Sequence, residues 1–232
     1  MILDQPNSDN PLMYDLSFIY TMRCDLECPF CMYNSRPASI GSINLSSLAG
    51  WLKTVDMGRI ASFGVYGGEV SVDYVGFGAC LDLVAKWDLP RFVITNGTWS
   101  TSSRKTWEFL HFVNQYGLYV VVSGTPEHRR YQDRKVLETL QAKYPEAIRL
   151  KSLEENYHAM GKLAGKMLFS CSQKCMSWKR ALRLAIQPNG TIIFQNCDGV
   201  YPVVGNLSES FSEIDTRVQG MRETGFSVCC PY

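Results

Sequence analysis

Several features that would place a protein in a special class are missing from this sequence. No apolar run approaches the roughly 18 residues that a membrane span needs. Residues 1–13 are polar and carry two prolines, so they do not look like a secretory signal. The net charge is +1, from 23 basic and 22 acidic residues, which gives no strong long-range field toward nucleic acid or an acidic membrane. These absences predict a cytoplasmic protein that has no membrane partner.

Repeats and low-complexity tracts are also absent, and histidine is scarce, with three residues. A length of 232 residues, with 46% apolar and 19% charged residues, suits one medium domain or a core with a small appendage. Cysteine is the exception, because the chain has nine. Thiols stay reduced in the cytoplasm, so these cysteines indicate metal or catalytic chemistry before disulfides. Three lie within residues 24–31 and five lie from residue 171 onward.

Short β-rich runs alternate with helical patterns in the first 150 residues, at the spacing of βα units with parallel strands. Two further β-rich runs, 182–187 and 191–195, flank Pro188-Asn189-Gly190, which is a hairpin signal. We expect an α/β fold: a partial, open parallel β/α barrel of about six strands over residues 1–165, then a small hairpin-and-helix region over 166–232. The first five expected strands are Leu16–Tyr20, Ile60–Tyr66, Arg91–Thr95, Leu118–Ser123 and Ala147–Lys151.

Polar or glycine-containing segments follow the first four of these strands. Ligands of parallel α/β folds bind at the carboxyl ends of the strands. We therefore expect the following segments to meet at one mouth: Cys24 to Cys31, Gly67-Gly68-Glu69, Thr95-Asn96-Gly97 and Ser123-Gly124-Thr125.

The first cysteine group is Cys24, Cys28 and Cys31. Three thiolates this close can hold one iron–sulfur cluster, which normally takes four cysteines, so one iron would keep an open coordination position. An open position is the mark of a reactive metal centre. The alternative is a zinc knuckle, but zinc would want four tight ligands, and the nearest histidine in sequence is His111.

The pattern C-x3-C-x2-C, with the aromatic Phe30 before the third cysteine, resembles the signature loop of the radical S-adenosylmethionine (SAM) superfamily. The resemblance implies that Cys24, Cys28 and Cys31 hold a catalytic 4Fe–4S cluster whose open iron binds SAM. An electron, from a reductant such as flavodoxin or ferredoxin, would then cleave SAM to a 5′-deoxyadenosyl radical that abstracts hydrogen from a substrate. The protein would supply position and dryness, and the cofactors the chemistry.

The segments after the later strands fit the same resemblance. Gly67-Gly68-Glu69 resembles the family's GGE motif, which implies that Glu69 binds the amino group of SAM. Thr95, Asn96 and Ser123 suit contacts to the ribose and carboxylate, or they are ordinary turn residues. Phe30 would pack near the adenine or simply fill its loop. The family's glycine-rich adenine motif after the fifth strand is missing.

The remaining cysteines resemble a second module of the family. The hairpin, a following cysteine and Gly205-Asn206-Leu207 match the order of a SPASM or twitch region. The resemblance implies a second 4Fe–4S cluster, although six residues separate Gly190 from Cys197 where four are usual. A structural zinc site is the alternative. Four of five cysteines would be ligands: Cys171, Cys175, Cys197, Cys229 and Cys230. Cys80 lies on an apolar helical stripe and is expected to be a buried core thiol.

The sequence says less about the substrate. About a dozen residues precede the first expected strand, so we expect no leader-peptide-binding domain, and a peptide substrate would then need a separate partner. Four basic residues near the second cysteine group could meet a phosphate or carboxylate, although a solvated face is the preferred interpretation: Lys174, Lys179, Arg180 and Arg183. The short chain also resembles phage radical SAM isomerases that rearrange an amino acid appended to thymine in DNA. The alternatives are a maturase of a peptide or protein side chain, a non-catalytic iron–sulfur electron carrier, and a zinc-stapled binding module. His128 could reach the mouth, but an exposed loop histidine is the preferred interpretation.

Overall fold

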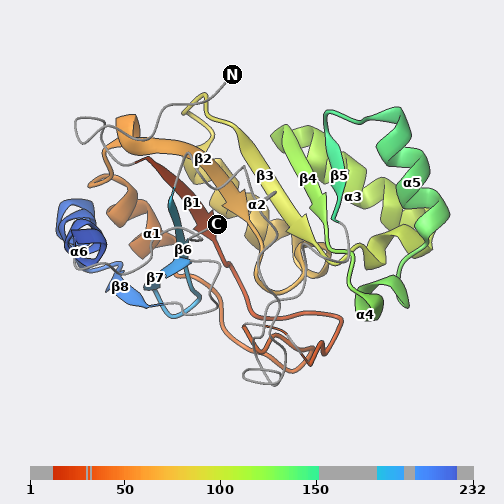
Figure 1. Cartoon of the computed structure of the whole chain (residues 1–232), viewed down its shortest axis with the longest axis horizontal. Coiled ribbons are helices and arrows are strands. Elements are labelled where there is room, and N and C mark those ends of the chain that lie inside the picture. Colours follow the sequence, from red (N-terminus) through yellow and green to blue (C-terminus); the bar gives the residue numbers. More distant parts are fainter. Residues whose placement is uncertain (1–12, 30, 32, 152–181, 196–201, 224–232) are drawn as a thin grey trace.

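The computed structural model describes residues 13–29, 31, 33–151, 182–195 and 202–223. Their strands form one eight-stranded sheet in the order β5-β4-β3-β2-β1-β6-β7-β8 (Figure 1). The strands from β5 to β6 are all parallel, whereas β7 and β8 run antiparallel to their neighbours. The sheet is not closed, which confirms the expected open α/β architecture with six parallel strands. The bounds are β1 (Tyr14–Phe18), β2 (Ile60–Val65), β3 (Arg91–Thr95), β4 (Leu118–Val122), β5 (Ile148–Leu150), β6 (Leu182–Ile186), β7 (Thr191–Gln195) and β8 (Val203–Asn206).

Helices connect the strands and begin at side-chain caps. The hydroxyl of Ser102 accepts a hydrogen bond from the backbone N–H of Lys105 at the start of α3, and Asp133 caps α5 in the same way. The helix α3 ends at Gly117, whose φ of 60° is left-handed. The bounds are α1 (Leu45–Leu52), α2 (Tyr74–Val84), α3 (Ser103–Tyr116), α4 (Pro126–Arg129), α5 (Arg134–Lys143) and α6 (Phe211–Glu223), with short 3-10 turns η1 (Met57–Arg59), η2 (Val70–Val72) and η3 (Thr98–Thr101). None of the helices in the described part of the chain has the length and apolar character that crossing a membrane requires.

The main core lies between the sheet and its helices. Side chains alternate between the two faces of a strand, and Tyr14, Leu16 and Phe18 of β1 are all fully buried in this core with apolar residues of α1, α2, α3, α5 and α6. The other face of the sheet carries a smaller buried cluster around Ile19 and Tyr66. The helices therefore cover one face, and the other face is the inner side of the partial barrel.

The strand β6 lies beside β1, on the side away from β5. The residues of β6 pair in register with all of β1, from Tyr14 with Leu182 to Phe18 with Ile186. The hairpin predicted at 182–195 is therefore an extension of the core sheet. The boundary expected near residue 165 lies outside the described residues.

The helix α6 is also anchored to the N-terminal part of the chain. The ring of Phe211 packs edge-on against Tyr14 and Trp51, at 5.6 and 6.2 Å between centroids. The Tyr14 hydroxyl donates to Asp215 at 2.5 Å, and the Arg59 guanidinium holds the same carboxylate at 2.7 and 3.0 Å. Residues from both ends of the described chain thus share one core.

The first strand lies two residues earlier than predicted, at Tyr14–Phe18 in place of Leu16–Tyr20. Ile19 and Tyr20 follow the strand but still pack, because Ile19 is buried in the inner cluster and the Tyr20 ring contacts Phe77 at 5.6 Å. Apolar residues that are buried just beyond the end of a strand continue its hydrophobic pattern, so the sequence does not show where the strand ends.

Candidate functional site

The four segments expected to meet at one mouth do meet, at the carboxyl ends of β1 to β4. The backbone N–H of Gly68 donates to the carbonyl of Thr21, and that of Glu69 donates to the carbonyl of Arg23, both at 2.9 Å. Ser123, at the end of β4, donates its backbone N–H to the carbonyl of Thr95 at 2.9 Å. The long connection after β1 extends beyond the same end of the sheet as α4 (Figure 1).

The two glycines of the GGE segment let it approach the cysteine loop. A Cβ at Gly67, where φ is 129°, would lie 2.1 Å from the Cγ2 of Ile19. A Cβ at Gly68 would lie 1.9 Å from the carbonyl oxygen of Arg23, which is backbone and cannot rotate away. Close backbone packing of this kind requires glycine.

Glu69 is 1% exposed and its carboxylate is held by three donors. Its Oε1 accepts from the Thr95 hydroxyl at 2.7 Å and from the Ser71 N–H at 3.2 Å, and its Oε2 accepts from the Asn96 N–H at 2.7 Å. Burial raises the pKa of Glu69 to about 7, although these hydrogen bonds lower it. Among the described residues, no lysine, arginine or histidine forms an ion pair with it. About four lone-pair directions exist on a carboxylate, so one on Oε2 is left for a further donor.

Asn96 joins this carboxylate to the cysteine loop. Its Nδ2 donates to Oδ1 of Asp25 at 2.7 Å and lies 3.7 Å from Sγ of Cys24. The Thr95 hydroxyl, besides donating to Glu69, accepts from Nε1 of Trp99 at 3.0 Å. Thr95 and Asn96 are thus parts of one buried network with Glu69, in addition to forming the turn.

Each of the three sulfur atoms lies beside a nitrogen. Cys24 Sγ accepts from the Leu26 N–H at 3.4 Å, Cys31 Sγ accepts from the Ser35 N–H at 3.3 Å, and Cys28 Sγ lies 3.5 Å from Nε2 of His128. Burial raises the pKa values of Cys24 and Cys28 to about 12. Nearby negative charge adds to this: Glu69, Asp25 and Cys28 act on Cys24, and Cys31, Glu127 and Asp25 act on Cys28. The thiols are close enough to influence one another.

Solved structures with this fold were found, although no family model and no curated protein matches the sequence. The structure of BtrN in complex with AdoMet and 2-DOIA superposes with a TM-score of 0.60 at 15% identity, over 96% of this chain and 92% of BtrN. The structure of anSMEcpe with bound AdoMet and Cp18Cys peptide gives a TM-score of 0.53 at 14% identity, over 93% and 84% of the two chains. The chain has the partial-barrel fold of radical SAM enzymes.

The donor set of the cysteine loop fits the iron–sulfur cluster that the radical SAM fold implies. Thiolate sulfurs bound to iron accept hydrogen bonds, and all three sulfurs here have a nitrogen beside them. In the described part of the chain, no three His, Cys, Asp or Glu side chains converge to hold a single metal ion. A cluster does not need that convergence, because each thiolate binds a different iron. Because the free Cys24 and Cys28 thiols are protonated at neutral pH, binding iron would release protons.

The sequence pattern did not predict two residues that hold the ends of the strands together, Gln132 and Asp25, and it did not favour a third, His128. Gln132 donates from Nε2 to the carbonyls of Asn96 and Ser123, at 2.6 and 2.7 Å, and so ties β3 to β4. Asp25 accepts from Asn96. His128 contacts Cys28 and is half-buried in α4, contrary to the preferred interpretation of an exposed loop residue. The signal for α4 was present, because Thr125 followed by proline is a helix N-cap with proline at the first helical position.

Several residues that the sequence analysis assigned to the two cysteine sites or to the basic run are not among those the structure describes. Phe30 and the five C-terminal cysteines, Cys171, Cys175, Cys197, Cys229 and Cys230, lie outside the described residues, as do Lys174, Lys179 and Arg180. Arg183 is described, and it does not belong to a solvated face. Its guanidinium lies over Phe92 at 4.9 Å from the ring centroid and 3.8 Å from the carboxylate of Asp15. Cys80 is fully buried in the core, as expected.

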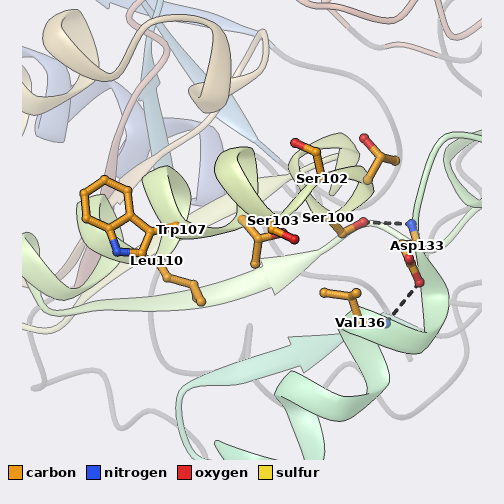
Figure 2. A pocket seen from close by; sticks show the side chains of 9 residues that line it. Ser100, Ser102, Ser103, Trp107, Leu110, Asp133 and Val136 are labelled. Atoms are coloured by element: carbon orange, nitrogen blue, oxygen red, sulfur yellow. Dashed lines mark hydrogen bonds between the residues drawn. The ribbon is translucent and has the colours of Figure 1, made fainter.

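A groove of about 400 Å³ lies where α3 and α5 begin (Figure 2). Its rim includes Trp107, which is 66% exposed. The hydroxyl of Ser100 donates to the carbonyl of Gly97 and accepts from the N–H of Asp133, so it is occupied in joining the two helix starts. The residues of this groove and those of the cysteine loop do not overlap.

Proposed function

We propose that this chain is a radical SAM enzyme in which Cys24, Cys28 and Cys31 hold a 4Fe–4S cluster with one open iron. One observation carries the proposal: three sulfurs, each beside a nitrogen, lie on one loop at the carboxyl edge of an open parallel sheet, and Asn96 joins the first of them, Cys24, to the buried carboxylate of Glu69. When bound, the reduced cluster and SAM together supply a 5′-deoxyadenosyl radical that abstracts hydrogen from the substrate. The fold match to two structures holding AdoMet supports the proposal.

Glu69 would receive the amino group of SAM. Its carboxylate is fixed by three donors, it has one lone-pair direction left, and no cation of the described residues pairs with it. A ligand ammonium would supply the missing charge. Thr95 and Asn96 hold Glu69 in place, and Ser123 would line the ribose side with Phe30 near the adenine.

A second 4Fe–4S cluster is part of the proposal, held by four of the five C-terminal cysteines. The order of hairpin, cysteine and Gly205-Asn206-Leu207 supports it, and the hairpin is formed by β6 and β7. Iron and zinc analysis of the reconstituted protein tests this part. Iron for two clusters per chain is the expected result, whereas iron for one cluster with one zinc would replace it with a structural zinc site.

The substrate we propose is an amino-acid-modified thymine of phage DNA, which the enzyme would isomerise. The likeness of the compact sequence to phage isomerases supports it, whereas Arg183, the described member of the basic run, turns toward Asp15 and Phe92. The alternative is a peptide or protein side chain, and the anSMEcpe structure with its Cp18Cys peptide favours it. Stimulation of radical formation by modified DNA or by a peptide distinguishes the two.

The test of the core proposal is anaerobic reconstitution with iron and sulfide, followed by dithionite and SAM. Formation of 5′-deoxyadenosine, measured by mass spectrometry, is the expected result, with flavodoxin or ferredoxin as reductant in the cell. Cluster absorbance without SAM cleavage would indicate an electron carrier. The absence of both cluster absorbance and cleavage would indicate a zinc-stapled module. Cys28→Ala should abolish cleavage, whereas Cys80→Ala, at a core thiol far from the loop in sequence, should retain it.

A further inference from the structure

His128 has a defined neighbour at each ring nitrogen. It lies in α4, which follows β4, and its Nδ1 is 3.0 Å from the hydroxyl oxygen of Thr125. Its Nε2 is 3.5 Å from Sγ of Cys28, a residue one hundred positions earlier in the chain. The ring is therefore held between the cap of its own helix and the cysteine loop.

The protonation state of the Cys28 sulfur determines which ring nitrogen of His128 carries the proton. A thiol can donate to Nε2, but a thiolate bound to iron has no proton and can only accept. Once Cys28 binds iron, its contact with His128 is a hydrogen bond only if Nε2 carries hydrogen. The neutral ring must then accept at Nδ1, and the Thr125 hydroxyl is the group placed to donate there. The Thr125 oxygen can accept from the His128 N–H at 3.3 Å at the same time.

The surroundings of Cys28 explain why a donor matters there. Glu127 and Asp25 place negative charge near this sulfur, and the electron that reduces a cluster adds charge of the same sign. Hydrogen bonds to cluster sulfurs are among the factors that set the reduction potential. The donors at the other two sulfurs include backbone N–H groups, whereas the nitrogen beside the Cys28 sulfur belongs to a side chain from another βα unit.

We propose that His128 is a positioning residue that donates its Nε2–H to the Cys28 thiolate and so makes the cluster easier to reduce, with Thr125 fixing the tautomer. The inference rests on the proposed function, since it needs a cluster at this loop. It concerns the potential of the cluster, which can be measured without SAM or substrate.

The experiment compares His128→Leu with His128→Gln in the reconstituted full chain. Glutamine places an amide N–H₂ at a similar reach along the side chain, and leucine has no donor. Midpoint potentials come from redox titrations followed by electron paramagnetic resonance. We expect leucine to lower the ratio of reduced to oxidised cluster about tenfold at a fixed potential, which for one electron is a shift of about −59 mV. Glutamine should retain most of the wild-type potential.

A potential unchanged in His128→Leu, or shifted as far by glutamine as by leucine, would overturn the role of His128. If His128→Leu does not bind iron, Thr125→Val is measured against Thr125→Ser, which keeps the hydroxyl. A negative shift of the midpoint potential in Thr125→Val but not in Thr125→Ser supports the proposal, and equal potentials in the two variants refute it. A wild-type protein that forms no cluster at all would refute the proposed function itself, and its iron content reports this separately.

Discussion

Glu69 gives the sharpest test of the site, through the substitution Glu69→Gln. Both carboxylate oxygens accept from groups that can only donate toward them, namely the N–H of Asn96 and Ser71 and the hydroxyl of Thr95. The Thr95 hydroxyl is committed to donating, because its oxygen already accepts from Trp99 and from the Gly97 N–H. The amide NH₂ of glutamine would therefore face a donor whichever way it turns, at a cost of roughly 1–3 kcal/mol.

Glutamine also removes the free-energy cost of burying the charged form of Glu69, and this contribution to stability depends on pH. Burial raises the pKa of Glu69 from 4.5 to about 7, so the folded protein binds more protons than the unfolded chain between these values. The contribution of Glu69 to stability therefore falls as pH rises through this window and is constant above it. Between pH 5 and pH 8, the wild type should lose roughly 2–3 kcal/mol of unfolding free energy relative to the variant.

Urea unfolding of the metal-free protein at the two pH values measures this difference, since groups common to both proteins cancel. Parallel pH curves would mean that Glu69 is ionised throughout and that its three hydrogen bonds outweigh burial. Equilibrium binding of SAM to the reconstituted proteins tests the other half. Loss of a hydrogen bond to a charged group predicts roughly 10- to 100-fold weaker binding by the variant, and equal affinity would show that Glu69 does not contact the amino group.

Two further predictions concern the packing that holds the site. Gly68→Ala should destabilise the protein by roughly 1–3 kcal/mol in urea unfolding, because the new Cβ meets the backbone of Arg23 at 1.9 Å. The control Gly50→Ala, which has nothing within 4 Å in α1, should be neutral or slightly stabilising, and similar losses in both would refute the close approach. Asp215→Ala should lower stability by roughly 3 kcal/mol, since it removes the carboxylate that accepts two hydrogen bonds from the Arg59 guanidinium, whose side chain is 15% exposed. Arg104→Ala breaks an exposed pair on α3 and should leave the melting temperature unchanged; a matching loss there would show that the Arg59 pair is not special.

Much of the fold could be read from local patterns. The strands Arg91–Thr95 and Thr191–Gln195 have the predicted bounds, and Ser102 caps α3, because alternation and capping are properties of adjacent residues. The side of β1 on which β6 pairs could not be read, because parallel pairing between distant segments leaves no local signature. The sequence placed the GGE segment near the cysteine loop only through the rule that parallel strands share a carboxyl edge.

The site was predictable as a set of segments but not as a set of contacts. The segments containing Cys24, Glu69 and Asn96 meet as expected, yet the hydrogen bond from Asn96 to Asp25 depends on loop conformation. His128 followed no motif, and its approach to Cys28 depends on where α4, which follows β4, lies relative to the loop that follows β1. A contact between side chains of two different loops can be identified only when the conformations of both loops are known.

The position of β1 in the middle of the sheet affects how the protein can be made. This strand directly precedes the cysteine loop, and one of its neighbours is β6, whose residues Leu182–Ile186 are translated long after the loop itself. While the chain is still on the ribosome, the strand has an open edge and the loop beside it lacks its final support. We therefore expect iron to be delivered after β6 has been translated and has paired with β1, and not to the nascent segment that contains only β1 and the loop.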